Sequence, residues 1–391
     1  MSQQPPPLPP NDADEPIFLD HSFDGEGERI DDENGHIFPC EGCGSDLVFH
    51  INTQKLKCPH CGFEKEIGFD PDQEVEEQDI YSMLAHLQEL RENPEAASDE
   101  REQEVRCESC GATLLFVDSM TSSECPYCAS PIQLENAHTS DKRVPVDAVL
   151  PFQIEQQVAR QNLRDWVKSL WFAPNEFIEK GAEGTFHGIY LPYFTYDSMT
   201  STRYSGQRGE HYYVTVGSGK NQRRERRTRW YPASGAFQRF FDDVVILASQ
   251  GLPRALIEEL EPFPMQKLVP FRHAYLAGFT ARTYDIELDD GFVLGKERID
   301  AELYADVCSR IGGDTQRIDS INTKYDAITY KHLLLPLWLM TYKYKGELYQ
   351  VAVNASTGEV NGERPYSWVK IFFASLVGGA IVIGGLVFAN H

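Results

Sequence analysis

CEGCGSDLVFHINTQKLKCPHC, residues 40–61, contains two Cys-x-x-Cys pairs separated by fourteen residues. The same arrangement returns in CESCGATLLFVDSMTSSECPYC, residues 107–128. Two such pairs can present four thiolates to one Zn²⁺ with tetrahedral geometry. The sequence therefore predicts two tandem four-cysteine zinc ribbons that bind two Zn²⁺. The predicted ligands are Cys40, Cys43, Cys58 and Cys61 in the first ribbon and Cys107, Cys110, Cys125 and Cys128 in the second.

The residues around the cysteines support this interpretation. Gly follows the second cysteine of each copy and Pro follows the third, and such residues shape turns whose N–H groups point at sulfur. These residues are Gly44, Gly111, Pro59 and Pro126. Residues 46–57 are expected to form two strands around a turn at Asn52-Thr53. A module of about 30 residues buries too little apolar surface to fold alone, so the metal is expected to supply the missing free energy.

The other cysteines and histidines fit the same interpretation. A pair of disulfide-bonded modules is the alternative, and it is disfavoured because no secretory signal peptide precedes the cysteines. His50 and His60 are expected to be bystanders, since eight cysteines complete two tetrahedra. Eight of the nine cysteines in ligand spacing indicate a reducing compartment. Cys308 lies in a helical pattern, where a buried and unreactive thiol is usual.

The charge is unevenly distributed along the 391 residues. Residues 1–150 contain 33 Asp and Glu against 9 Lys and Arg, whereas residues 151–391 contain 27 of each kind. The net charge of −24 therefore lies entirely on the half that carries the predicted ribbons. Binding to nucleic acid depends on Lys and Arg that neutralise phosphates. The distribution makes nucleic acid an unlikely partner and favours a protein.

Composition and pattern suggest six segments. Ile80, Met83, Leu84, Leu87 and Leu90 have helical spacing, which predicts a helix that packs on the ribbons or docks a partner. The segments are a disordered acidic tail (1–35), the first ribbon (36–70), an acidic amphipathic helix and linker (71–104), the second ribbon (105–137), an α+β domain (138–365) and a transmembrane anchor (366–391).

The α+β domain is predicted to contain an internal duplication. Residues 154–171 and 295–311 each place apolar side chains on one helical face. Extended segments lie near both helices, and YLPYFTYD, YLAGFTARTYD and LLPLWLMTYKY resemble one another. We expect a repeated helix-plus-hairpin unit with antiparallel sheets.

Residues 371–389, IFFASLVGGAIVIGGLVFA, contain no charge. About 20 apolar residues are needed to cross a hydrocarbon core of roughly 30 Å. Trp368 and Lys370 resemble an interfacial belt with positive charge on the near side. These features predict a single-pass helix that ends the chain, with the body in the cytoplasm, and a buried core helix is the alternative. Small residues at Ala374/Gly378 and Ser375/Gly379 are compatible with self-association through this helix.

No known catalytic motif is apparent. GSGK at residues 217–220 lacks the Gly that a phosphate-binding loop requires at Val214, and Asn221 replaces Ser or Thr, so a hairpin turn is expected. Asp242-Asp243 is expected to cap a helix rather than form a catalytic pair. The run RRERRTRW, residues 223–230, could bind anionic lipid, an acidic partner or the acidic half of the chain, or form a solvated loop.

Together with the ribbons, RWYPASGAFQRFFDDVVILAS (229–249) and YQVAVNASTGEVNGERPYSWVKI (349–371) make the chain resemble a bacterial family of membrane-anchored double zinc-ribbon proteins. These are often catalogued as primosomal protein N-prime (replication factor Y) helicase-like or as transcription factor IIB-type zinc-ribbon proteins. The resemblance implies a place at the bacterial inner membrane. Some similar proteins are linked to envelope stress, in which they recruit an SPFH-type or phage-shock-type partner.

These observations favour a non-enzymatic, membrane-anchored adaptor that recruits a cytoplasmic protein partner. A replication or transcription factor that uses the ribbons and residues 223–229 to contact nucleic acid is the first alternative. An enzyme with an unrecognised site is the second.

Overall fold

The computed structural model describes residues 38–68, 75–92, 102–106, 113–115, 122–124, 131–133, 137–140, 143–175, 186–217, 222–250, 252–344, 347–376 and 379. The predicted acidic tail, residues 1–35, lies outside them.

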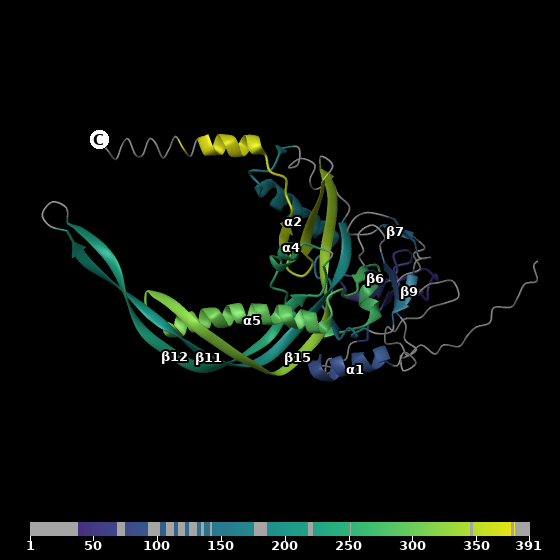
Figure 1. Cartoon of the computed structure of the whole chain (residues 1–391). Helices are drawn as coiled ribbons and strands as arrows, with labels where there is room; N and C mark the ends of the chain where they lie inside the picture. Colours follow the sequence, from purple (N-terminus) through teal and green to yellow (C-terminus); the bar gives the residue numbers. More distant parts are fainter. Residues whose placement is uncertain are drawn as a thin grey trace, which may run out of the picture.

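Three very long strands dominate the structure: β11 (Phe186–Val216), β12 (Arg223–Leu247) and β15 (Thr315–Tyr344). They belong to a twelve-stranded, mostly antiparallel sheet in which β11 pairs with both β12 and β15. The three strands curl together into a long band, and helix α5 (Leu288–Ile311) runs along its concave side (Figure 1).

The remaining elements are short. The other strands of the large sheet are β4 (Gln78–Asp79), β5 (Glu102–Arg106), β6 (Thr113–Leu115), β9 (Ala137–Ser140), β10 (Ala148–Val149), β13 (Val269–Pro270), β14 (Thr280–Arg282), β16 (Glu347–Asn354) and β17 (Val360–Gly362). β1 (Val48–His50), β2 (Lys55–Lys57) and β3 (Glu64–Lys65) form one small sheet, and β7 (Ser122–Glu124) and β8 (Pro131–Gln133) form another. The other helices are α1 (Ile80–Glu92), α2 (Gln156–Ser169), α4 (Arg254–Glu258), η4 (Met265–Lys267) and η5 (His273–Leu276).

The first half of β11 is buried on both faces because helices and loops cover the sheet on each side. Side chains alternate between the two faces of a strand, so Tyr190 packs with α2 residues such as Leu163, whereas Leu191 packs with Leu256 of α4. The second half of β11 is increasingly exposed. One end of β11 is therefore buried in the core, whereas the other end is exposed to solvent and remains paired with β12.

Helix α5 packs closely on the curled strands through two glycines. A Cβ atom at Gly291 would lie 2.3 Å from Tyr196 Oη, and one at Gly295 would lie 3.2 Å from the Tyr196 ring. The Tyr196 hydroxyl donates to the carbonyl of Leu288 at 2.8 Å. Further along the helix, Leu303 is buried against the same strands. The glycines let the helix axis approach the sheet.

The helices expected at 154–171, at 295–311 and between the ribbons are confirmed as α2, α5 and α1. The buried face of α1 packs on the large sheet, where Ile80 and Leu87 are buried with Tyr196 and Tyr330.

The predicted α+β fold class with a duplicated helix-plus-hairpin unit is wrong, because the structure is mostly β and has one large curled sheet. Two of the similar segments do not begin separate units but pair directly with each other, with Tyr190 opposite Pro336. The third contains the end of η5 and the short strand β14, which pairs in parallel with β11. Strands usually contain 3–10 residues. The alternation of apolar and polar stretches therefore suggested several short hairpins, whereas β11 and β15 are single strands of 31 and 30 residues.

The predicted membrane anchor must also be corrected. Among the residues that the structure describes, no helix is long and apolar enough to cross a membrane. The described part of the C-terminal helix covers residues 368–376, which at 1.5 Å per residue extend about 14 Å. Its first turn is bonded to the body, since Lys370 Nζ donates to the Ala173 carbonyl at 2.8 Å. The remainder of 371–389, apart from residue 379, lies outside the described residues.

The membrane expectations rested on the apolar run 371–389, its flanking Trp368 and Lys370, and the family resemblance. The single-pass topology, the inner-membrane location and the self-association through this helix therefore have no support in the described structure.

Replacing Gly291 with Val tests the close packing of α5. We expect the variant to lose about 1–3 kcal/mol of unfolding free energy, because the new methyl groups overlap Tyr196. Ala301→Val on the exposed face of the same helix is the control and should change stability little. Urea unfolding followed by circular dichroism measures both, and equal stability of the two variants would contradict this packing.

Candidate metal centre

The first ribbon contains two turns with matching hydrogen bonds. Cys40 N–H donates to the Ser45 carbonyl at 2.8 Å, and Cys58 N–H donates to the Phe63 carbonyl at the same distance. Gly44 and Gly62 then donate back to the carbonyls of Cys40 and Cys58. Both glycines have positive φ, +74° and +78°, a region that glycine adopts without steric cost. The sequence prediction singled out Gly44 and missed Gly62, although Gly follows the cysteine pair in both CEGCG and CPHCG.

These turns bring Cys40, Cys43, Cys58 and Cys61 together, with all four Sγ atoms within 4.8 Å of one another. Cys40 Sγ lies 3.4 Å from Cys61 Sγ, and Cys43 Sγ lies 3.5 Å from Cys58 Sγ. Four sulfurs about 2.3 Å from a tetrahedral Zn²⁺ are separated by about 3.8 Å. The cluster therefore has the size and donor set of a four-thiolate metal site.

The surroundings favour thiolate at one ligand. Cys61 N–H donates to Cys58 Sγ at 3.5 Å, and Ser45 Oγ lies 3.3 Å from the same sulfur. These hydrogen bonds, the backbone bond first, lower the pKa of Cys58 to about 5. His50 Nδ1 lies 3.1 Å from Thr53 Oγ1, and neither His50 nor His60 belongs to the cluster of four cysteines.

The ribbon is packed into the body of the protein. Phe49 N–H donates to the Ala277 carbonyl at 3.0 Å, and its ring centroid is 5.6 Å from that of Tyr275. Gln54 Nε2 donates to the Phe152 carbonyl at 2.9 Å. Cys40 and Cys58 themselves belong to the buried cluster that contains α2 and part of the large sheet. The four-cysteine cluster therefore lies next to the main core.

The second predicted ligand set, Cys107, Cys110, Cys125 and Cys128, lies outside the described residues. Cys308 lies on α5, is partly buried and is remote in sequence from both sets.

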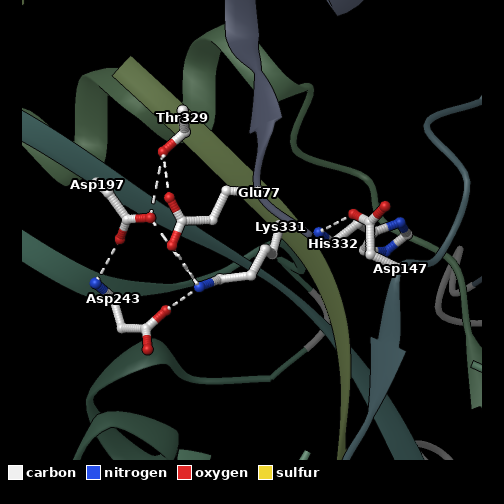
Figure 2. A network of polar contacts seen from close by, with 7 residues as sticks. All are labelled: Glu77, Asp147, Asp197, Asp243, Thr329, Lys331 and His332. Atoms are coloured by element: carbon white, nitrogen blue, oxygen red, sulfur yellow. Dashed lines mark hydrogen bonds and ion pairs between the residues drawn. The ribbon is translucent and has the colours of Figure 1, made fainter. Parts of the chain in front are cut away.

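A second group of polar side chains surrounds Lys331 of β15 (Figure 2). Lys331 Nζ lies 2.8 Å from Asp243 Oδ1, 3.3 Å from Glu77 Oε1 and 4.0 Å from Asp197 Oδ2. Thr329 Oγ1 lies within hydrogen-bond distance of Glu77 and Asp197. Burial disfavours the ammonium, but the three carboxylates outweigh it and raise the pKa of Lys331. The ammonium supplies the positive charge that these carboxylates require.

A β-bulge positions this network. The register between β11 and β12 shifts between Tyr196 and Ser198, and Asp243 has φ of +50°, which is uncommon for a residue other than Gly. Asp197 Oδ1 accepts the Asp243 N–H at 2.6 Å, and burial raises the pKa of Asp197 to about 6. The bulge directs Asp243 toward Lys331. The prediction that Asp242-Asp243 caps a helix is wrong, since both residues lie in β12.

His332, next to Lys331, is buried. Its Nδ1 donates to the Val144 carbonyl at 3.0 Å, and Asp147 Oδ2 accepts its backbone N–H at 2.7 Å. Burial lowers the pKa of His332 to about 4 and raises that of Asp147 to about 6. Lys331, His332 and Asp147 were not predicted as site residues, although the Lys-His pair that interrupts the apolar run ITYKHLLLPLWLM indicates buried polar groups.

The predicted hairpin around GSGK is confirmed by its flanking strands, because Val216 of β11 pairs with Arg223 of β12. The basic run that follows is part of β12 and not a loop.

No family model matches the sequence, and no solved structure matches the chain. The chain is similar to "Uncharacterized protein YdjG" of Bacillus subtilis (strain 168), with 27% identity over 363 residues, which cover 90% of this chain and 96% of YdjG.

The pH dependence of stability tests the buried state of His332. Its pKa is about 4 in the folded protein and about 6.5 in an unfolded chain, so the unfolded state binds the proton more tightly. Stability contributed by neutral His332 is therefore lost as pH falls from 6.5 toward 4. Between pH 7 and 4.5 we expect the wild type to lose about 2 kcal/mol more than His332→Asn, measured by urea unfolding.

Asp147 and Asp197 have raised pKa values and stabilise the folded state as pH falls below 6. The wild type and His332→Asn both contain these aspartates, so their contribution cancels when the two pH profiles are compared. His86→Asn on the exposed face of α1 should follow the wild-type pH profile. Parallel profiles for the wild type and His332→Asn would mean that the ring is accessible to protons.

Proposed function

We propose that this protein is a non-enzymatic, zinc-binding adaptor that holds a protein partner. In this proposal Zn²⁺ binds Cys40, Cys43, Cys58 and Cys61, and a second Zn²⁺ binds Cys107, Cys110, Cys125 and Cys128. The observation that carries the proposal is the four-thiolate cluster at the edge of the main core. A site with four protein ligands leaves no position for substrate or activated water, which is typical of structural zinc.

The metal would act as a staple between the ribbon and the body. Cys40 and Cys58 are buried, whereas Cys43 and Cys61 are exposed, so the ion would connect the core to the outer turns. Leu47, Phe49 and Leu56 of the ribbon complete the buried cluster around α2. Without the metal, four thiols close to one another would have no common partner, and the ribbon would lose its fixed position.

The network around Lys331 also supports a structural interpretation. Its ammonium forms an ion pair with Asp243 and lies close to Glu77. An ammonium whose pKa is raised by carboxylates stays protonated at neutral pH and does not act as a base or nucleophile. Removing one partner of such a buried pair would leave an uncompensated charge.

Support for binding a partner comes from the shape of the curled sheet. β11 and β12 continue beyond the end of β15 pairing at Gly209 and extend to Val216 and Arg223. Figure 1 shows this two-stranded extension reaching beyond α5. Tyr212 and Tyr213 on it are exposed, with 60% of Tyr213 accessible to solvent. Exposed aromatic residues are enriched at protein interfaces.

Metal analysis tests the zinc assignment. We expect about two Zn²⁺ per chain in the wild type, from the donor sets of two ribbons. Cys40→Ser should contain about one Zn²⁺ and unfold at lower temperature, because Cys40 belongs to the main core. Cys308→Ser removes a cysteine outside both sets and should keep both ions. A wild type with less than one Zn²⁺, or equal zinc in Cys40→Ser, would contradict the assignment.

Capture of partners tests the adaptor role. The full-length, zinc-loaded protein should enrich a defined protein from a lysate of the source cells, and Cys40→Ser should enrich it less, because loss of the metal destabilises the core in which β11 is buried. Crosslinking followed by mass spectrometry identifies the captured protein. If nuclease treatment abolishes the enrichment, the protein is a nucleic-acid factor instead.

A further inference from the structure

We define the arm as residues 209–216 of β11 and 223–231 of β12. Gly209 is the last residue of β11 that pairs with β15, and the described residues of β11 beyond it pair only with β12. The outer edge of β12 has no backbone hydrogen-bond partner over Arg223–Tyr231 in the described part of the chain. An edge strand of this kind presents N–H and C=O groups that another strand can use.

The edge carries arginines on both faces. Alternation places Arg224 and Arg226 on one face and Arg223, Arg227 and Arg229 on the other. The acidic neighbours are few: Glu225 lies 3.6 Å from Arg227, and no ion pair occupies Arg223, Arg224 or Arg226 among the described residues. Glu210 of β11 lies opposite Arg229. The arm is therefore positive on both faces, and in its described part the face of Arg224 and Arg226 carries no carboxylate.

Aromatic side chains of β11 hold two of these arginines in place. The Arg224 guanidinium lies over the Tyr213 ring at 5.2 Å, and that of Arg229 lies over the Tyr212 ring at 5.3 Å. At the base of the arm, Arg317 of β15 lies 4.0 Å from the Trp230 ring centroid. Such stacking orients guanidinium groups without neutralising them. The arm is thus an ordered, positively charged edge.

We propose that the outer edge of β12 over Arg223–Tyr231 binds an extended, acidic segment of a partner protein as an additional β-strand. Backbone hydrogen bonds along the edge would give affinity, and acidic side chains on either face of the added strand would meet arginines. The proposal rests on the adaptor function proposed above and specifies the surface and the chemistry of the partner.

Two other occupants fit this edge less well. A second copy of the same edge in antiparallel register would place arginines opposite arginines, which is unfavourable. Nucleic acid would satisfy the charge but has no backbone that continues a β-ladder, so the free N–H and C=O groups of β12 would stay unused. An acidic polypeptide satisfies both requirements.

The test uses three probes with the full-length, zinc-loaded protein. The first is a ten-residue peptide with the repeat Glu-Glu-Thr-Thr, which places glutamates on both faces of an added strand. The second has the same sequence with every backbone amide N-methylated, so that it keeps the charge but has no N–H to donate on either edge. The third is a fifteen-nucleotide oligo-dT. Fluorescence anisotropy gives the affinities, and hydrogen exchange reports protection of Arg223–Tyr231.

We expect the unmodified peptide to bind at least tenfold more tightly than the N-methylated one and to protect the β12 amides. Arg224→Gln/Arg226→Gln should weaken its binding about tenfold or more. Arg164→Gln/Lys168→Gln on the exposed face of α2 removes the same charge elsewhere and should change binding less than twofold.

Equal binding of the two peptides would show charge attraction without strand addition and would overturn the proposal. Tighter binding of oligo-dT would assign the arm to nucleic acid, and absence of peptide binding would mean that the arginines only protect the edge. Each of these results would leave the adaptor role intact if Arg224→Gln/Arg226→Gln still captured the same protein from lysate. Absence of capture by the wild type would instead refute the adaptor role itself.

Discussion

The antiparallel ladder between β11 and β15 is the interaction on which the other parts of the structure depend. It runs from Phe186 paired with Met340 to Gly209 paired with Thr315, and almost every residue of its first half is buried. Buried backbone groups must be hydrogen-bonded, so this half of β11 requires a partner on each edge. β15 provides one, and β12 and the short strand β14 share the other. The ribbon, α2 and α5 all pack on surfaces that this ladder creates.

The polar network around Lys331 lies where the ladder between β11 and β15 passes from buried to increasingly exposed residues. Asp197 and Lys331 lie on adjacent strands between the apolar core and the exposed extension, and the bulge at Asp243 adds a third charge. A bulge increases local twist and bends the bulged strand. The network therefore lies where the sheet turns from the core into the curled band, and the Asp197 side chain satisfies the N–H that the bulge exposes. The bulge at Asp243 therefore accounts both for the ion pair with Lys331 and for a bend in the sheet at this point.

Sequence patterns predicted local features well and the arrangement of the sheet poorly. The cluster of Cys40, Cys43, Cys58 and Cys61 follows from spacing, because metal-binding turns are determined by residues close in sequence. Helices α2 and α5 follow from their apolar periodicity. The length of β11 could not be read in this way, since apolar and polar stretches within one strand look like separate strands. The partners of Lys331 come from positions 77, 197 and 243, and no local pattern connects them.

Net charge and local charge are separate observations in this chain. Residues 1–150 have a net charge of −24, which suggested repulsion of anionic partners. The described part of β12 nevertheless contains five arginines between Arg223 and Arg229, and no ion pair occupies Arg223, Arg224 or Arg226 among the described residues. Exposed charges are largely screened beyond a Debye length of about 8 Å in physiological salt. In the strand-addition proposal, an approaching segment would therefore respond to these neighbouring arginines and to the edge of β12 rather than to the net charge of the whole chain.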